Sequence, residues 1–196
     1  WKRPQAGRRY VAGADVAEGI EVDGAAPNDK YDWSVADVLD QHTGEQVAQF
    51  RAQLEADSFG EQLDLLGRWY NTAYMGIERN NNGETTIVSL EHRGYPLSAI
   101  FARTYSPDGS RYNPPQKGWK TTHITRNNLV NLLDRSLREV SVIINSEQTV
   151  REFLSFIVKA NGRPEAKEGE KDDCVFSLGI AMMMIPAAPE MRVEAP

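Results

Sequence analysis

The chain has 196 residues, 40% of them hydrophobic and 26% charged, which fits a single globular domain over residues 1–196. We expect residues 10–185 to form its core and residues 186–196 to be an irregular tail. No run approaches the ~18 apolar residues of a membrane-spanning helix, and no signal-peptide pattern occurs, so we expect no membrane contact. The formal net charge of −6 argues against a protein that coats nucleic acid through bulk positive charge.

Cysteine usage and local basic clusters refine this picture only slightly. The single cysteine, Cys174, has no partner for a disulfide, which agrees with a reducing, cytosolic compartment. The chain opens with Trp1 rather than Met, so we expect a processed chain or an excised part of a longer one. Local basic clusters are usually solvated surface, although some could meet phosphates. The candidates for such contacts are Arg111, Lys117, Lys120 and Arg126.

The first part of the chain predicts three strands, a helix and a fourth strand. Short apolar runs indicate strands at residues 10–16, 32–39 and 46–54, and the Asp, Thr and Gly residues at 40–44 suit a tight antiparallel connection. Apolar residues then recur at spacings of three and four, which predicts an amphipathic helix with Ser58 as its N-cap. Residues 73–78 follow as a short buried strand.

The rest of the chain predicts further helices and a hairpin. We expect a helix over 85–92 that ends at Gly94, a fifth strand over 98–104, and a Pro- and Gly-rich loop or hairpin over 105–122. Helices are predicted at 125–139, 146–153 and 173–185. Residues 156–159 and 163–166 flank Asn161-Gly162, a strong signal for a two-residue hairpin turn. The fold class is therefore α/β, with a central mixed sheet flanked by helices.

Acidic residues stand at the ends of several predicted elements. Asp15 ends the first strand, Glu78 ends the fourth, and Asp172 and Asp173 begin the last helix. Each has an ordinary explanation: carboxylates form turns, lie exposed at strand ends, and cap helices. Together they match the needs of phosphodiester cleavage, because two Mg²⁺ ions ~3.5–4 Å apart can be held by a few carboxylates on rigid elements.

The order of these motifs resembles the nuclease domain of the large terminase subunit of tailed bacteriophages. Nearly the whole chain is covered, from Tyr10 to about Ala181, by the stretches YVAGADVAEG, YDWSVADVLDQHTGEQVAQ, YNTAYMGIERNNNG and ANGRPEAKEGEKDDCVFSLGIA. The resemblance implies a ribonuclease H-like fold whose first three strands are antiparallel. It also implies an endonuclease that needs two divalent ions, Mg²⁺ or Mn²⁺, and cuts concatemeric viral double-stranded DNA during genome packaging.

The resemblance also assigns roles to the acidic residues. Asp15 matches the aspartate that bridges two metals, Glu78 the acidic residue ending the fourth strand, and Asp172 or Asp173 the final acidic pair. We favour Asp173 for direct ligation, because it starts the predicted buried helix, and Asp172 for binding through water.

Two further positions match the family pattern less firmly. Asp32 corresponds to a recurring aspartate that could lie near the site or serve the structure. Lys171 stands where relatives often have histidine, which leaves a proton-transfer or metal-tuning role unfilled and suggests a contact with a phosphate instead.

A complete large terminase also contains an ATPase motor with a GxxxxGK[ST] loop, and this sequence has none. We therefore expect the nuclease portion alone, with the motor domain, the small terminase subunit and the portal as partners on the procapsid in the host cytoplasm. Two alternatives stay open: a RuvC-like junction resolvase, and a non-catalytic domain that clamps DNA or docks a partner. Cut-site preference and oligomeric state are not encoded in any recognisable motif.

Overall fold

The computed structural model describes residues 1–17, 32–80, 82–105, 109–159 and 164–189. Its centre is a four-stranded sheet in the order β3-β2-β1-β4. The strands are β1 (Tyr10–Asp15), β2 (Ser34–Asp40), β3 (Gln46–Ala52) and β4 (Tyr74–Ile77). β1 pairs antiparallel with β2, β2 antiparallel with β3, and β1 parallel with β4. The predicted mixed sheet with an antiparallel start is confirmed.

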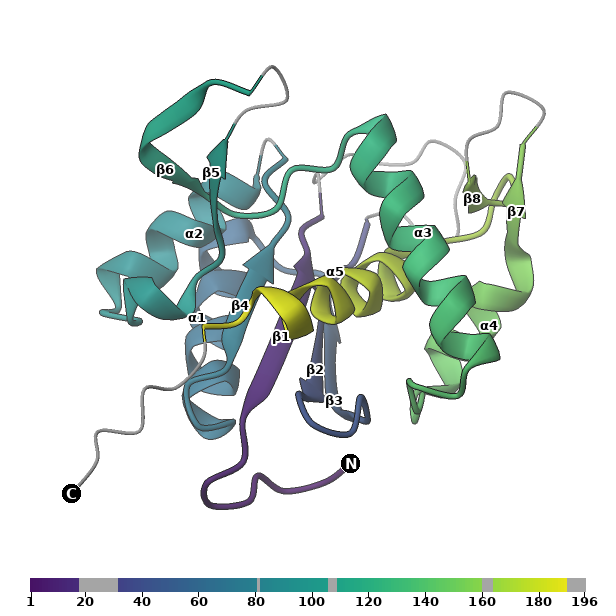
Figure 1. Ribbon diagram of the computed structural model, residues 1–196, viewed down its shortest axis with the longest axis horizontal. Helices are drawn as coiled ribbons and strands as arrows, with labels where there is room; N and C mark the ends of the chain where they lie inside the picture. Colours follow the sequence, from purple (N-terminus) through teal and green to yellow (C-terminus); the bar gives the residue numbers. More distant parts are fainter. Residues whose placement is uncertain (18–31, 81, 106–108, 160–163, 190–196) are drawn as a thin grey trace.

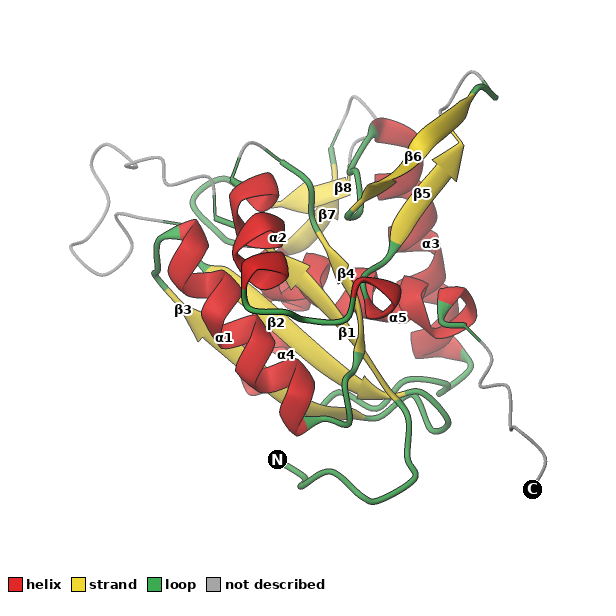
Figure 2. Cartoon of the chain, turned by 90° about the vertical axis from the view of Figure 1, so that its left-hand side faces the viewer, coloured by secondary structure: helices red, strands yellow, loops and turns green. Residues whose placement is uncertain are grey.

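Helices cover both faces of this sheet (Figures 1 and 2). On one face, α1 (Ala56–Trp69) and α2 (Gly83–His92) pack over Ala12 and Ala14 of β1. On the other, α5 (Asp173–Ala187) and α3 (His123–Arg138) pack over Val11. Because alternate residues of a strand point to opposite faces, β1 contributes to both cores. No helix in the described part of the chain is long and apolar enough to cross a membrane.

The contact between β1 and α5 is unusually close. A Cβ atom at Gly13 would lie 2.1 Å from the backbone nitrogen of Ala181 and 2.2 Å from the carbonyl oxygen of Ser177. Glycine therefore lets the helix backbone rest directly against the strand. This packing fixes where the N-terminal end of α5 lies relative to the end of β1.

Two hairpins project from the layered core. β5 (Ala102–Tyr105) pairs antiparallel with β6 (Arg111–Lys117), after a 3₁₀ turn η1 (Leu97–Ala99). β7 (Phe156–Val158) pairs antiparallel with β8 (Pro164–Ala166), directly after α4 (Glu147–Ser155). The pairing of the second hairpin is as predicted, while its expected Asn161-Gly162 turn lies outside the described residues.

Three predictions differ from the structure: the pairing of one strand, the start of one helix and the end of another. The segment expected as a fifth strand touches the sheet only through a bridge between Ile100 and Met75, because its strand residues pair with β6 instead. Helix α1 begins before Ser58, with Glu55 at its N-cap position. Helix α5 continues through Pro186 to Ala187, so the expected irregular tail starts later, and residues 190–196 lie outside the described part.

Candidate metal centre

Three elements bring their acidic residues to one edge of the sheet. β1 and β4 are parallel neighbours, so their carboxyl ends meet, and the backbone N–H of Glu78 donates to the carbonyl of Ala14 at 2.8 Å. Asp15 is the last residue of β1. Helix α5 packs along β1 and starts at the same edge, with Asp172 at its N-cap and Asp173 as its first residue. The four predicted carboxylates therefore line a single cavity of about 500 Å³.

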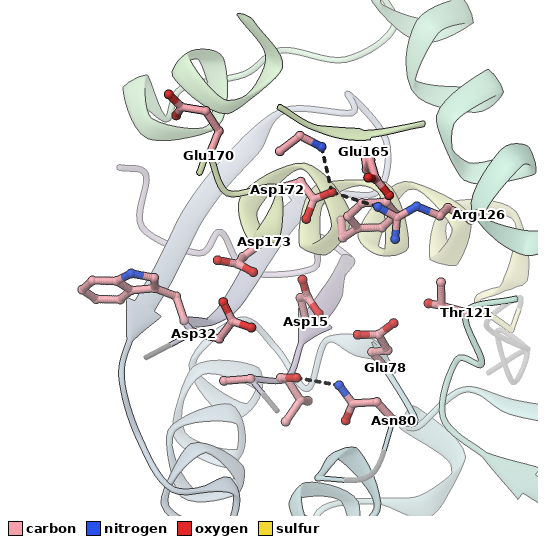
Figure 3. Close-up of a pocket in the computed structure, with 15 residues that line it drawn as sticks. Asp15, Asp32, Glu78, Asn80, Thr121, Arg126, Glu165, Glu170, Asp172 and Asp173 are labelled. Atoms are coloured by element: carbon pink, nitrogen blue, oxygen red, sulfur yellow. Dashed lines mark hydrogen bonds and ion pairs between the residues drawn. The ribbon is translucent and has the colours of Figure 1, made fainter. Parts of the chain in front are cut away.

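The cavity is strongly acidic (Figure 3). Its lining includes one basic residue, Arg126, against seven acidic ones, which are Asp15, Asp32, Glu78, Glu165, Glu170, Asp172 and Asp173. In Figure 3, Asp15 lies at the centre, with Glu78 on one side and Asp32 and Asp173 on the other. A DNA phosphate would be repelled by this lining unless cations neutralise it.

Two of these carboxyl groups have pKa values raised by their surroundings. Burial, followed by the nearby charge of Glu78, raises the pKa of Asp15 well above its ordinary value. Burial, followed by the charges of Asp32 and Glu152, raises the pKa of Asp173 to about 8. Both shifts mean that the ionised forms are disfavoured in the protein alone. A divalent cation would reverse this balance by supplying the missing positive charge.

Asp173 gives the clearest sign that the residues suit a metal. Its Oδ2 atom is buried and has no hydrogen-bond partner, although buried carboxylate oxygens normally have one. Carboxylate oxygen is also the ligand that Mg²⁺ prefers. Among the described residues, no three Asp, Glu, His or Cys side chains already stand close enough together to hold an ion.

Asp172 and Asp173 differ in their surroundings. Asp172 makes no side-chain capping hydrogen bond to α5, so the ordinary capping explanation does not hold for it. Its Oδ2 atom instead pairs with Nη2 of Arg126 at 2.8 Å and accepts from the backbone N–H of Ala166 at 3.3 Å. The Arg126 charge partly opposes the rise that burial causes in the pKa of Asp172. Asp172 is thus already engaged by the protein, whereas Asp173 retains an unused oxygen.

The two less firmly matched positions lie side by side. Asp32 lines the cavity, and Nζ of Lys171 forms an ion pair with its Oδ1 atom. Lys171 does not itself line the cavity. The lysine therefore offsets the charge of one cavity carboxylate, and its positive charge also opposes the rise in the pKa of Asp173.

The four basic candidates for phosphate contact are spread out. Arg126 lines the cavity, but its guanidinium also donates to the carbonyl of Pro164 at 2.8 Å and stacks 3.9 Å from the ring centre of Phe176. Lys117 pairs with Glu91 at 2.6 Å. Arg111 and Lys120 are exposed and lie outside the cavity lining.

Sequence reasoning missed several residues of the cavity wall, namely Trp33, Asn80, Thr121, Glu165 and Glu170. Asn80 follows the fourth strand and could have been found by its position, and its side chain donates to the carbonyl of Val16 at 2.6 Å. Thr121 had no such signal, because it reaches the cavity through a bridge between Trp119 and Glu78. Its Oγ1 atom is buried and unpartnered.

Comparisons with known proteins give likenesses in structure only. No protein-family model matches the chain, and no curated protein matches it significantly. Among solved structures, the large terminase nuclease from thermophilic phage G20c with bound magnesium has a TM-score of 0.68 at 19% identity, covering 93% of this chain and 84% of that one. The same nuclease with bound cobalt has a TM-score of 0.67, also at 19% identity, with the same coverage of both chains.

A second phage gives the same result. The large terminase nuclease domain of Thermus phage P74-26 has a TM-score of 0.63 at 20% identity, covering 92% of this chain and 81% of that one. Similarities at this level of identity concern the fold. The chain therefore has the ribonuclease H-like fold of large terminase nuclease domains.

Proposed function

We propose that this chain is a divalent-metal-dependent endonuclease that hydrolyses double-stranded DNA, acting as the nuclease portion of a phage packaging terminase. The observation that carries the proposal is the convergence on one acidic cavity of Asp15 at the end of β1, Glu78 directly after β4 and Asp173 at the start of α5. The likeness in fold to terminase nucleases solved with bound magnesium, cobalt and zinc supports it.

In this proposal Asp15, Glu78 and Asp173 hold two ions, Mg²⁺ or Mn²⁺. Asp15 would serve both, because it stands between the other two carboxylates in Figure 3. Asp172 would bind only through water, since Arg126 already holds one of its oxygens. Divalent ions, when bound, stabilise negative charge on the reacting phosphate and lower the pKa of water.

The remaining residues of the chain would orient the substrate. Arg126 is the one basic residue of the cavity wall among the described residues, so it is the candidate to face the phosphate that is cut. Lys171 would act through Asp32, whose carboxylate it pairs with. Arg111, Lys117 and Lys120 lie on or just after β6 and would contact the DNA backbone.

The test is plasmid nicking in Mg²⁺ or Mn²⁺ by the wild-type chain and by Asp15→Asn, with Asp134→Asn as the control. Asp134 lies on exposed α3 surface, in an i,i+4 pair with Arg138. We expect Asp15→Asn to abolish nicking while its thermal unfolding shows a folded protein, and Asp134→Asn to cut normally. Full activity of Asp15→Asn would overturn the assignment.

The same preparation separates the alternatives. A strong preference for four-way junctions over linear duplex would favour a RuvC-like resolvase. Binding of DNA without cleavage, together with no thermal shift in Mn²⁺, would favour a clamping or docking domain. The wider setting is part of the proposal: the ATPase motor, the small terminase subunit and the portal as partners, on the procapsid in the host cytoplasm. Co-purification of the chain with the motor domain, the small terminase subunit and the portal would test these partners.

A further inference from the structure

The first turn of α5 is capped by a residue from another helix. The side chain that usually caps a helix belongs to the N-cap residue and accepts from the backbone N–H two or three positions later. Here that residue is Asp172, and it makes no such bond. Instead Oε2 of Glu152, on α4, accepts from the backbone N–H of Cys174 at 2.7 Å.

The side chain of Glu152 is held in place by burial and by a second hydrogen bond. It is only 3% exposed, and its other oxygen, Oε1, accepts from the side chain of Gln148 one turn earlier at 3.1 Å. Both carboxylate oxygens therefore have partners in the protein. The positive end of the α5 dipole offsets part of the cost of burying this charge.

The negative charge of Glu152 opposes ionisation of the two aspartates at the start of α5. This charge is among the causes that raise the pKa values of both Asp172 and Asp173. An uncharged side chain that filled the same space would avoid this repulsion. A buried hydrogen-bond acceptor at this point fixes the start of α5, and neither Asp172 nor Asp173 is needed as the cap.

We propose that Glu152 is a positioning residue for the metal centre: by capping α5 from α4, it holds Asp173 toward the cavity and leaves both aspartates free of capping. This inference rests on the proposed metal-dependent function. Residues that hold a metal ligand in place without touching the metal typically change metal affinity 10- to 100-fold when they are removed.

The experiment compares Glu152→Gln, Glu152→Ala and Glu152→Asp in the full chain, with Glu147→Ala as the control. Glu147 lies on the same helix but is exposed and pairs with Arg151. Mn²⁺ binding is measured by calorimetry without DNA, and hydrogen exchange of the Cys174 amide is measured without metal. The Mn²⁺ concentration that gives half-maximal nicking is measured alongside KM for DNA.

Glu152→Gln keeps an oxygen that can accept from Cys174, so we expect its Mn²⁺ affinity to stay within about threefold of wild type. Glu152→Ala should weaken Mn²⁺ binding about 10-fold or more. It should also speed exchange of the Cys174 amide, with KM for DNA unchanged. Glu152→Asp keeps the charge but shortens the reach, so it should bind Mn²⁺ more weakly than Glu152→Gln. That comparison decides the matter if Glu152→Ala does not fold.

Wild-type Mn²⁺ affinity in folded Glu152→Ala would overturn the inference, as would normal binding by Glu152→Asp alongside impaired binding by Glu152→Gln, since charge rather than reach would then matter. Failure of the proposed function looks different. In that case the wild-type chain itself would neither bind Mn²⁺ nor cut DNA, and the inference would fall with it.

Discussion

Replacing Asp173 by asparagine should stabilise the protein without metal and weaken its response to metal. Asp173 has a folded-state pKa of about 8 against an ordinary value of 3.8. Because the folded pKa is the higher one, the folded protein binds more protons between those values, so stability is lost as the pH rises from about 4 to about 8. At pH 7 this carboxyl is still mostly protonated in the folded protein but ionised in the unfolded chain, a difference that costs about 4 kcal/mol at most, taking 1.36 kcal/mol per pH unit.

Asparagine does not titrate, so its unfolded chain gains nothing from ionisation, and Asp173→Asn should be more stable than wild type at pH 7 in a chelator. An upper limit of about 4 kcal/mol corresponds to roughly 8 to 16 °C in Tm for a chain of this size. At a Mg²⁺ concentration of 100 times Kd, wild type should gain about 2.7 kcal/mol of stability, which raises its Tm. The variant should gain less, because one of the three proposed ligands is lost.

The assay is thermal unfolding of both proteins at pH 5 and pH 7, with and without Mg²⁺. The stability gap between the metal-free proteins should be smaller at pH 5 than at pH 7, because the pH then lies closer to the unfolded-state pKa of 3.8 and ionisation favours the unfolded chain less. A variant that is less stable than wild type at pH 7 in chelator, or that gains as much from Mg²⁺ as wild type, would refute the reasoning.

Three further predictions concern the packing around the site. Asp37 is fully buried, accepts from Ser177, Gln46 and Gln49, and has a pKa raised by burial to about 7. Wild type therefore loses free energy of unfolding as the pH rises from about 4 to about 7, because Asp37 ionises more readily in the unfolded chain. Urea unfolding should show that the stability of Asp37→Asn rises relative to that of wild type from pH 5 to pH 8. Gly13→Ala should cost about 3 kcal/mol or more by the same method, because its Cβ would collide with the backbone of α5. Arg126→Gln should cost about 3 kcal/mol because it leaves Asp172 unpaired, whereas Arg138→Gln, which breaks an exposed pair, should cost ~0.5 kcal/mol.

Each of these has a clear contrary outcome. A wild-type protein and an Asp37→Asn variant with parallel stability profiles would mean that Asp37 does not titrate in this range. Normal stability of Gly13→Ala would mean that α5 can move away from β1. Equal losses for the two arginine variants would show that burial does not matter to the Asp172 pair.

Local patterns were enough to predict most elements, for reasons visible in the structure. The turn residues between β2 and β3 specify an antiparallel pair, and the nearly all-apolar sequence of α5 matches a helix packed between the sheet and α3. The residues of β5 were recognised as strand but assigned to the wrong sheet. An alternating pattern identifies a strand without naming its partner, and β6 lies in a segment that the pattern left as a loop or hairpin.

The candidate site was predictable where a residue ends an element, and not where it reaches the cavity by a tertiary contact. Asp15, Glu78 and Asp173 fall at element ends and line the cavity together. Glu152 gave no such sign, because it lies within α4 and its role depends on how α4 packs against α5. Arg126 was recognised only as a basic residue; its pairing with Asp172 joins α3 to a segment 46 positions away.

The close packing of α5 on β1 also bears on how the protein is made. Synthesis proceeds from the amino end, so the carboxylates of β1 and β4 leave the ribosome well before Asp173 does. The helix that brings Asp173 is the same element that covers one face of the sheet. A nascent or truncated chain lacking α5 therefore has neither a finished core nor a complete set of carboxylates. Under the proposed function, such a chain cannot cut DNA.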